Sequence, residues 1–224
     1  MIQNPQIVIS RPAESVLVTN KLIRNTYILL SMTLLFSAFT AGLSVVLNFP
    51  YMGPLVTLGG YFGLLFLTTH LRNSAWGLLS VFALTGFMGL TLGPMINAYM
   101  SYYSNGAQLV MTAMGGTGVI FLGLSGYALT TRKDFSFMGG FIMVGVLVAF
   151  LGGIGAMIFS LPALALAVSA MFILLMSGFI LYHTGAMVHG SETNYIMATV
   201  SLYIAIYNLF VSLLHILGAF GGDD

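Results

Sequence analysis

Seven long apolar runs, separated by short polar connections, make up most of this 224-residue sequence. A helix needs about 20 mainly apolar residues to cross a hydrocarbon core of about 30 Å, and most of the runs reach this length. Their positions are 27–47, 55–69, 76–96, 109–129, 137–159, 163–182 and 195–217. The pattern predicts an all-α membrane protein, a seven-transmembrane helical bundle without a soluble domain of useful size.

The positive charges are distributed in a regular way along the chain. Each lysine or arginine lies before the first run, in the connection between the second and third runs, or in the connection between the fourth and fifth runs. These residues are Arg11, Lys21, Arg24, Arg72, Arg132 and Lys133. The intervening connections, 48–54, 97–108 and 160–162, contain no charged residue. Cytoplasmic loops of membrane proteins are enriched in lysine and arginine, so the amino terminus is expected in the cytoplasm.

This topology divides the chain into three parts. Residues 1–25 are expected to form a cytoplasmic tail, residues 26–218 the bundle, and residues 219–224 a short acidic tail on the opposite, periplasmic side. The first run is longer than the core of about 7 to 15 residues found in signal peptides, so we expect it to be retained as a span. Short loops fit a multi-pass protein of a bacterial inner membrane.

Composition narrows the classes of function. Charged residues make up 5% of the chain and apolar residues 58%, with a mean hydropathy of +1.02. A formal net charge of +1 gives no electrostatic basis for binding nucleic acid. The absence of cysteine excludes disulfides, thiolate nucleophiles and iron–sulfur clusters. Membrane lipids are the partner that composition implies.

The last apolar run differs from the others because small and polar residues recur along one side of the predicted helix. They are Asn194, Ala198, Ser201, Ala205, Asn208, Ser212 and His215. Unpaired amides are costly in hydrocarbon, so this side should face protein or trapped water. We therefore expect the seventh helix to be central and surrounded by the other six. Two interpretations stay open: hydrogen bonds between helices, or the lining of a functional cavity.

His183, at the predicted cytoplasmic end of the sixth run, is the most informative histidine. Partial burial among apolar neighbours would allow it to report proton activity, although a plain interfacial histidine is the simpler interpretation. His70, Arg72, His189 and Glu192 lie in cytoplasmic connections and are candidates for a mouth at that end. None of these pairs has the spacing of metal ligands, so no metal site is expected.

No enzymatic activity, catalytic residue or cofactor is expected. Ser125, within a Gly-Leu-Ser-Gly segment, together with His183 imitates the serine and histidine of rhomboid intramembrane proteases. Ser125 lies close to the cytoplasmic end of its run, however, and the sequence supplies no oxyanion hole. The spans contain no lysine for a retinal Schiff base, and glycines four residues apart are typical of helix packing.

Several segments in order match a known family. They are L-I-R-N-T-Y at 22–27, T-G-F-M-G-L-T-L-G-P at 85–94 with Tyr99, L-T-T-R-K-D at 129–134, H-G-S-E-T-N-Y-I at 189–196, S-L-Y at 201–203, N-L-F at 208–210 and L-L-H-I-L-G at 213–218. On these motifs, which span nearly the whole sequence, the chain resembles the Bax inhibitor (TMBIM) family and most closely its proteobacterial YccA branch. The resemblance implies seven helices with the seventh at the centre.

Two functions accompany this resemblance. Resemblance to the broad family implies a pH-gated leak for calcium or other cations, which a pair of acidic residues on the sixth and seventh helices controls. The YccA branch is known as a substrate and modulator of the membrane-anchored, ATP-dependent protease FtsH. In this sequence the two acidic positions align with His183 and Ala205, so the carboxylate ligands that Ca²⁺ prefers are missing.

The sequence therefore leads to two hypotheses. The favoured one is a non-enzymatic inner-membrane protein that binds FtsH and modulates it as a resistant substrate, offering its tail, residues 1–20, to the protease. The alternative is a pH-sensitive leak for Ca²⁺ or other cations, with H⁺ as the signal, through a cavity beside the seventh helix. Its candidate sensor and cavity residues are His183, Ser201, Tyr203, Ala205, Asn208 and Ser212.

Overall fold

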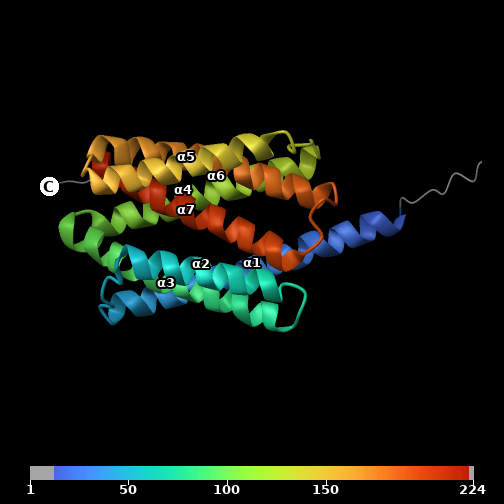
Figure 1. Ribbon diagram of the computed structural model, residues 1–224, viewed down its shortest axis with the longest axis horizontal. Helices are drawn as coiled ribbons and strands as arrows, with labels where there is room; N and C mark the ends of the chain where they lie inside the picture. Colours follow the sequence, from blue (N-terminus) through green and yellow to red (C-terminus); the bar gives the residue numbers. More distant parts are fainter. Residues whose placement is uncertain (1–12, 222–224) are drawn as a thin grey trace, which may run out of the picture.

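A computed structural model describes the backbone of residues 13–221 and the side chains of residues 17–221. Seven helices account for nearly all of this part of the chain, which contains no strand (Figure 1). They are α1 (Ala13–Val46), α2 (Gly53–Leu71), α3 (Trp76–Tyr102), α4 (Gly106–Thr131), α5 (Met138–Ile158), α6 (Pro162–Val188) and α7 (Tyr195–Gly221). Each contains a stretch long and apolar enough to cross a membrane, which confirms the predicted number of spans.

The helices are mostly longer than the apolar runs that predicted them. Helix α1 begins at Ala13, so much of the segment expected as a tail continues the first span as one helix. Helix α3 continues to Tyr102, past the end expected at Ile96. Residues 1–12 of the predicted amino-terminal tail, and residues 222–224 of the acidic one, lie outside the described residues.

Helix α7 crosses the molecule between two groups of three helices (Figure 1). In one group α1 and α2 each pack against α3, and in the other α4 and α5 each pack against α6. Helix α7 packs mainly against α1, α3, α4 and α6. The expected central position is confirmed, but the expectation of six surrounding helices is wrong. Helices α2 and α5 lie further out and pack mainly on α3 and α6, although Tyr61 on α2 is close enough to Tyr207 for an electrostatic interaction.

The close approach of α1 and α3 forms what we call the α1–α3 seam. A Cβ atom on Gly89 would collide with the Thr40 hydroxyl and the Ser37 carbonyl oxygen, and one on Gly93 would collide with Ser44. Small residues at this spacing let two backbones pack closely within a membrane. The seam therefore depends on residues that lack a side chain on the α3 side and carry a small hydroxyl on the α1 side.

Pro94 lies inside α3, where its ring nitrogen cannot donate the usual hydrogen bond to the carbonyl of Leu90. Ser44 Oγ on α1 donates to this carbonyl over 2.8 Å. Neighbouring helices commonly satisfy backbone groups that a proline leaves free in a membrane. This hydrogen bond explains how α3 continues through Pro94 and ties it to α1 at the same level.

All the charged connections lie at one end of the bundle. The α2–α3, α4–α5 and α6–α7 connections are found at the end from which α1 enters, and the chain leaves α7 at the opposite end (Figure 1). Asn194, before α7, donates from Nδ2 to the Arg72 carbonyl (3.0 Å) and to Asn73 Oδ1 (2.9 Å). Two of the connections are thus joined directly.

Candidate functional site

No residue of α7 from Tyr195 to Gly218 is exposed, and much of the helix is fully buried. Tyr203 is 1% exposed and connects three helices through its hydroxyl group. It accepts a hydrogen bond from Ser37 Oγ on α1 (2.6 Å) and donates to the Thr85 carbonyl on α3 (3.2 Å). This relay fixes α7 against the α1–α3 seam.

A second tyrosine repeats the arrangement one turn further along α7. The hydroxyl groups of Tyr207 and Thr91 are hydrogen-bonded over 3.1 Å, and the rings of Tyr203 and Tyr207 lie 6.4 Å apart. Thr91 also donates to the Met88 carbonyl, so the Tyr207 hydroxyl is the donor between the two side chains. Sequence reasoning named Tyr203 but missed Tyr207 and its partners on α3.

The predicted polar side of α7 is buried, but few of its members bond to another helix. Ala205 is fully buried and Ser212 is 6% exposed, whereas Ser201 and Asn208 are partly buried. Asn208 Nδ2 donates to the Ile204 carbonyl of its own helix over 2.9 Å. Asn208 is thus partly buried and bonded within its own helix, and the links to other helices come from Tyr203, Tyr207, Thr199 and His215.

His183 lies about one and a half turns inside the end of α6, because this helix continues to Val188. Its ring packs on Phe179 with a centroid distance of 4.2 Å and meets the edge of Tyr182 at 5.1 Å. Nδ1 is buried without a hydrogen-bond partner, and so is Ser125 Oγ. Since neither atom has a partner, the Ser125 and His183 pair is not a hydrogen-bonded catalytic arrangement.

The candidate mouth residues play separate roles in the connections. His70 is exposed and stacks on Phe66, while His189 is exposed and bonds the Gly185 carbonyl through Nδ1 (2.9 Å). Glu192 Oε1 accepts hydrogen bonds from the backbone N–H groups of Thr193 (2.8 Å) and Asn194 (2.7 Å). Glu192 therefore stabilises the turn that leads into α7, near the helix end where a carboxylate is favoured by the helix dipole.

Asp134 lies in the α4–α5 connection, at the same end of the bundle as the candidate mouth residues. Hydrogen bonds from the backbone N–H and the hydroxyl of Ser136 lower the pKa of the Asp134 carboxyl group, and the nearby His189 acts in the same direction. Asp134 is fully exposed, so its role is local to this connection.

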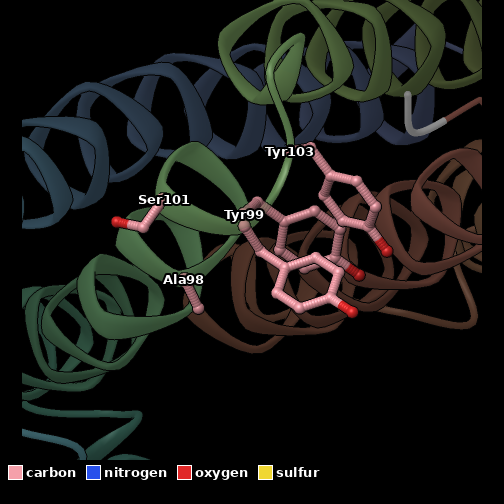
Figure 2. A pocket seen from close by; sticks show the side chains of 5 residues that line it. Ala98, Tyr99, Ser101 and Tyr103 are labelled. Atoms are coloured by element: carbon pink, nitrogen blue, oxygen red, sulfur yellow. The ribbon is translucent and has the colours of Figure 1, made fainter. Parts of the chain in front are cut away.

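A surface hollow of about 510 Å³ lies where α3 ends, lined by Ala98, Tyr99, Ser101, Tyr102 and Tyr103. Figure 2 shows the labelled rings of Tyr99 and Tyr103 with their hydroxyl groups on the same side, next to the ribbon of α7. Tyr99 covers Gly218, where a Cβ atom would meet the tyrosine ring. Asn105 Nδ2 donates to the Gly221 carbonyl over 2.6 Å. Tyr99, which lines the hollow, and the adjacent Asn105 thus hold the end of α7 in place.

No group of three or more histidine, aspartate or glutamate side chains that could hold a metal ion occurs among the described residues. The arrangement is that of a polytopic helical membrane protein, organised around a buried hydroxyl network on its last helix. Comparison with known proteins identifies the family to which the chain belongs. A family profile described as "Inhibitor of apoptosis-promoting Bax1" matches residues 19–222, and the chain belongs to this Bax inhibitor family.

Several bacterial proteins are similar over most of their length. An uncharacterized protein of Pseudomonas aeruginosa is 53% identical over 202 residues, which cover 90% of both chains. The protein named "Modulator of FtsH protease YccA" of Escherichia coli K12 is 51% identical over 209 residues, which cover 93% of this chain and 94% of the relative. An uncharacterized membrane protein of Vibrio cholerae is 40% identical over 224 residues, the full length of both. The expected resemblance is confirmed at the level of family and branch.

Proposed function

We propose that this chain is an inner-membrane protein that binds the FtsH protease and modulates it as a slowly degraded substrate. The observation that carries the proposal is the 51% identity, over 93% of the chain, to a relative named as a modulator of this protease. A relative from another Escherichia coli strain, equally similar, is named "Inner membrane protein YccA". The proposed orientation has the start of α1 in the cytoplasm and the end of α7 in the periplasm.

The packing of the bundle supports resistance to extraction. A processive protease must pull spans out of the bundle one after another, and α1 is the first span from the amino-terminal end. Removing α1 would break the α1–α3 seam, the Ser44 bond to the Leu90 carbonyl and the Ser37 bond to Tyr203. Each hydrogen bond between membrane helices contributes about 0.6 kcal/mol on average, in addition to close packing.

Residues 1–12, before the start of α1, are the segment that we propose the protease engages. This segment is shorter than the 20 residues expected from the sequence, since the backbone is helical from Ala13 onward. The exposed charges Lys21 and Arg24 on the first turns of α1 lie at the same end as the charged connections. A partner that reaches this end would meet the start of α1 and the charged connections together.

Co-purification with FtsH, combined with removal of residues 1–12, tests the proposal. We expect the full chain to be retained by FtsH and to slow the degradation of a second membrane substrate. The shortened chain should have a longer half-life in cells that contain the protease, and both chains should be equally long-lived in cells that lack it. If the full chain does not associate with FtsH and its half-life is the same with and without the protease, the proposal is refuted.

The alternative, a cation leak, is less well supported by the described residues. The seven candidate spans contain no carboxylate, and Ala205 at the expected acidic position is fully buried. Measuring calcium entry into liposomes across a range of pH separates the two functions. Flux above that of empty vesicles, abolished by His183→Ala, would establish the leak and would displace protease binding as the primary function.

A further inference from the structure

A groove of about 440 Å³ lies between the α5–α6 hairpin and α7, at the end of the bundle opposite the charged connections. Its walls are mostly small or apolar, and Ser169 and His215 supply its inner polar groups. The lining consists of Gly153, Ala156, Met157, Ser160, Leu161, Pro162, Ala165, Val168, Ser169 and His215. This volume is within the range of small-molecule sites and far exceeds that of a single water molecule.

The hydrogen bonds at the inner end of the groove fix the state of the imidazole. Ser169 Oγ donates its single proton to the Ala165 carbonyl over 3.0 Å. The same oxygen lies 2.7 Å from His215 Nδ1; with its own proton directed to the Ala165 carbonyl, it accepts the proton that Nδ1 carries. In the neutral imidazole, Nε2 then keeps a lone pair, and none of the described residues bonds to it. The inner end of the groove therefore offers one free acceptor, Nε2 of His215, while Ser160 adds a hydroxyl group from the α5–α6 connection.

This geometry excludes two other roles for the pair. With this tautomer the imidazole donates to Ser169 instead of accepting its proton, so it does not activate the serine as a nucleophile. The lining also contains a single histidine and no carboxylate or thiolate, so a metal ion would lack a ligand set. The free acceptor is suited to a ligand that donates a hydrogen bond.

The position of the groove indicates what kind of ligand reaches it. Ser169 is the eighth residue of α6, which places it roughly 10 Å from the start of that helix. The 27 residues of α6 extend over roughly 40 Å, which exceeds a hydrocarbon core of about 30 Å by roughly 5 Å at each end. The polar pair is thus roughly 5 Å below the edge of the core. The rim residues Met157 and Leu161 are 59% and 48% exposed, as expected for surface covered by lipid.

The lining also restricts the chemistry of the ligand. It contains no charged residue, so an ionic headgroup would gain nothing inside the groove and would stay at the water interface. Apart from the imidazole it contains no aromatic ring on which a planar molecule could stack. A flexible acyl chain with a hydroxyl group just below the interface matches both features.

We propose that this groove binds a glycerolipid whose glycerol backbone carries a free hydroxyl group, and that the hydroxyl donates to Nε2 of His215. A lysophospholipid and a diacylglycerol both have this chemistry, whereas a diacyl phosphatidylcholine has no donor at all. The site would let the bundle respond to lipid that has lost an acyl chain or its headgroup in the leaflet that contains the end of α7. This binding is independent of the protease and of the opposite end of the bundle.

The test measures lipid binding to the purified full chain by native mass spectrometry in an amine-oxide detergent, because maltoside detergents carry competing hydroxyl groups. The probes are lysophosphatidylcholine, dioleoylglycerol and dioleoylphosphatidylcholine. A neutral hydrogen bond corresponds to roughly a three- to tenfold change in affinity. We expect at least one hydroxyl-bearing probe to bind the natural chain three- to tenfold more tightly than it binds His215→Phe. Phosphatidylcholine should bind both chains equally.

Two further variants separate the groove from general effects on folding. Gly153→Leu adds a large apolar side chain to the groove lining and should also abolish the preference; a Cβ atom at Gly153 meets only Val168, at 3.8 Å. His70→Phe, on an exposed histidine at the other end, is the matched control and should leave it unchanged. Nitrogen NMR of labelled histidine in the natural chain should show a shift of Nε2 with a hydroxyl-bearing probe only. Equal binding of all three probes, or a preference that survives in both groove variants, would overturn the proposal.

Discussion

The α1–α3 seam gives the sharpest test of how this bundle is held together, through the substitution Gly89→Ala. The added methyl group would overlap the Thr40 hydroxyl and the carbonyl oxygen of Ser37, and would lie 3.0 Å from Ser37 Oγ. A carbonyl oxygen belongs to the backbone and cannot rotate away, so the two helices must separate. Overpacking of this kind costs about 1 to 3 kcal/mol, and separation would also weaken the bond between Ser37 and Tyr203.

The measurement is the free energy of unfolding in mixed micelles, followed by circular dichroism during titration with sodium dodecyl sulfate. Gly63→Ala on α2 is the matched control, because a Cβ atom there meets nothing within 4 Å. Alanine is a better helix former than glycine, so this control should be neutral or more stable by up to about 1 kcal/mol. If the two variants unfold with the same free energy, the close packing of the seam contributes nothing. We also expect Gly89→Ala to be degraded faster by FtsH than the control.

Four other substitutions test the polar contacts. Tyr203→Phe removes the relay between α1, α7 and α3 and should lower the free energy of unfolding by about 1 kcal/mol. Asn208→Leu loses only a bond within its own helix and should have a smaller effect than Tyr203→Phe. Asn194→Ala removes the side chain that accepts from the Met197 N–H and should speed hydrogen exchange in the first turn of α7; unchanged exchange would show that this cap is unimportant. The pKa of Asp134 is lowered in the folded chain, so this carboxylate should contribute stability above its ordinary pKa of 3.8. The contribution should be lost as the pH falls further. Infrared titration should find the carboxylate signal and this pH dependence absent in Asp134→Asn.

The fold was largely predictable because a membrane imposes simple rules on sequence. Span length, loop charge and the small or polar residues along 195–217 together predict seven helices with the last at the centre. The number of neighbours around α7 was not predictable in this way. A lipid-facing helix and a helix behind another helix have similar apolar composition, so the outer position of α2 and α5 leaves no clear pattern in the sequence.

The hydroxyl network was harder to predict for a different reason. Serine and threonine in membrane helices often bond to the carbonyl four residues earlier, as Thr85 does with Val81. The sequence does not distinguish such internal bonds from links between helices like that of Ser37 with Tyr203. A usable signal was present at the α1–α3 seam, where hydroxyl residues in α1 face glycines in α3. That pairing requires knowing which helices are neighbours.

The position of α7 has a consequence for biosynthesis. Helix α7, which packs against both groups of three helices, is the last of the seven to leave the ribosome, so six spans enter the membrane before the core that they share with it exists. A chain ending before Tyr195 would leave the Ser37 hydroxyl and the Thr85 carbonyl without their partner, facing acyl chains or one another. Such an unfinished intermediate would be loosely joined and open to quality control, whereas insertion of the final helix would complete both halves in a single step.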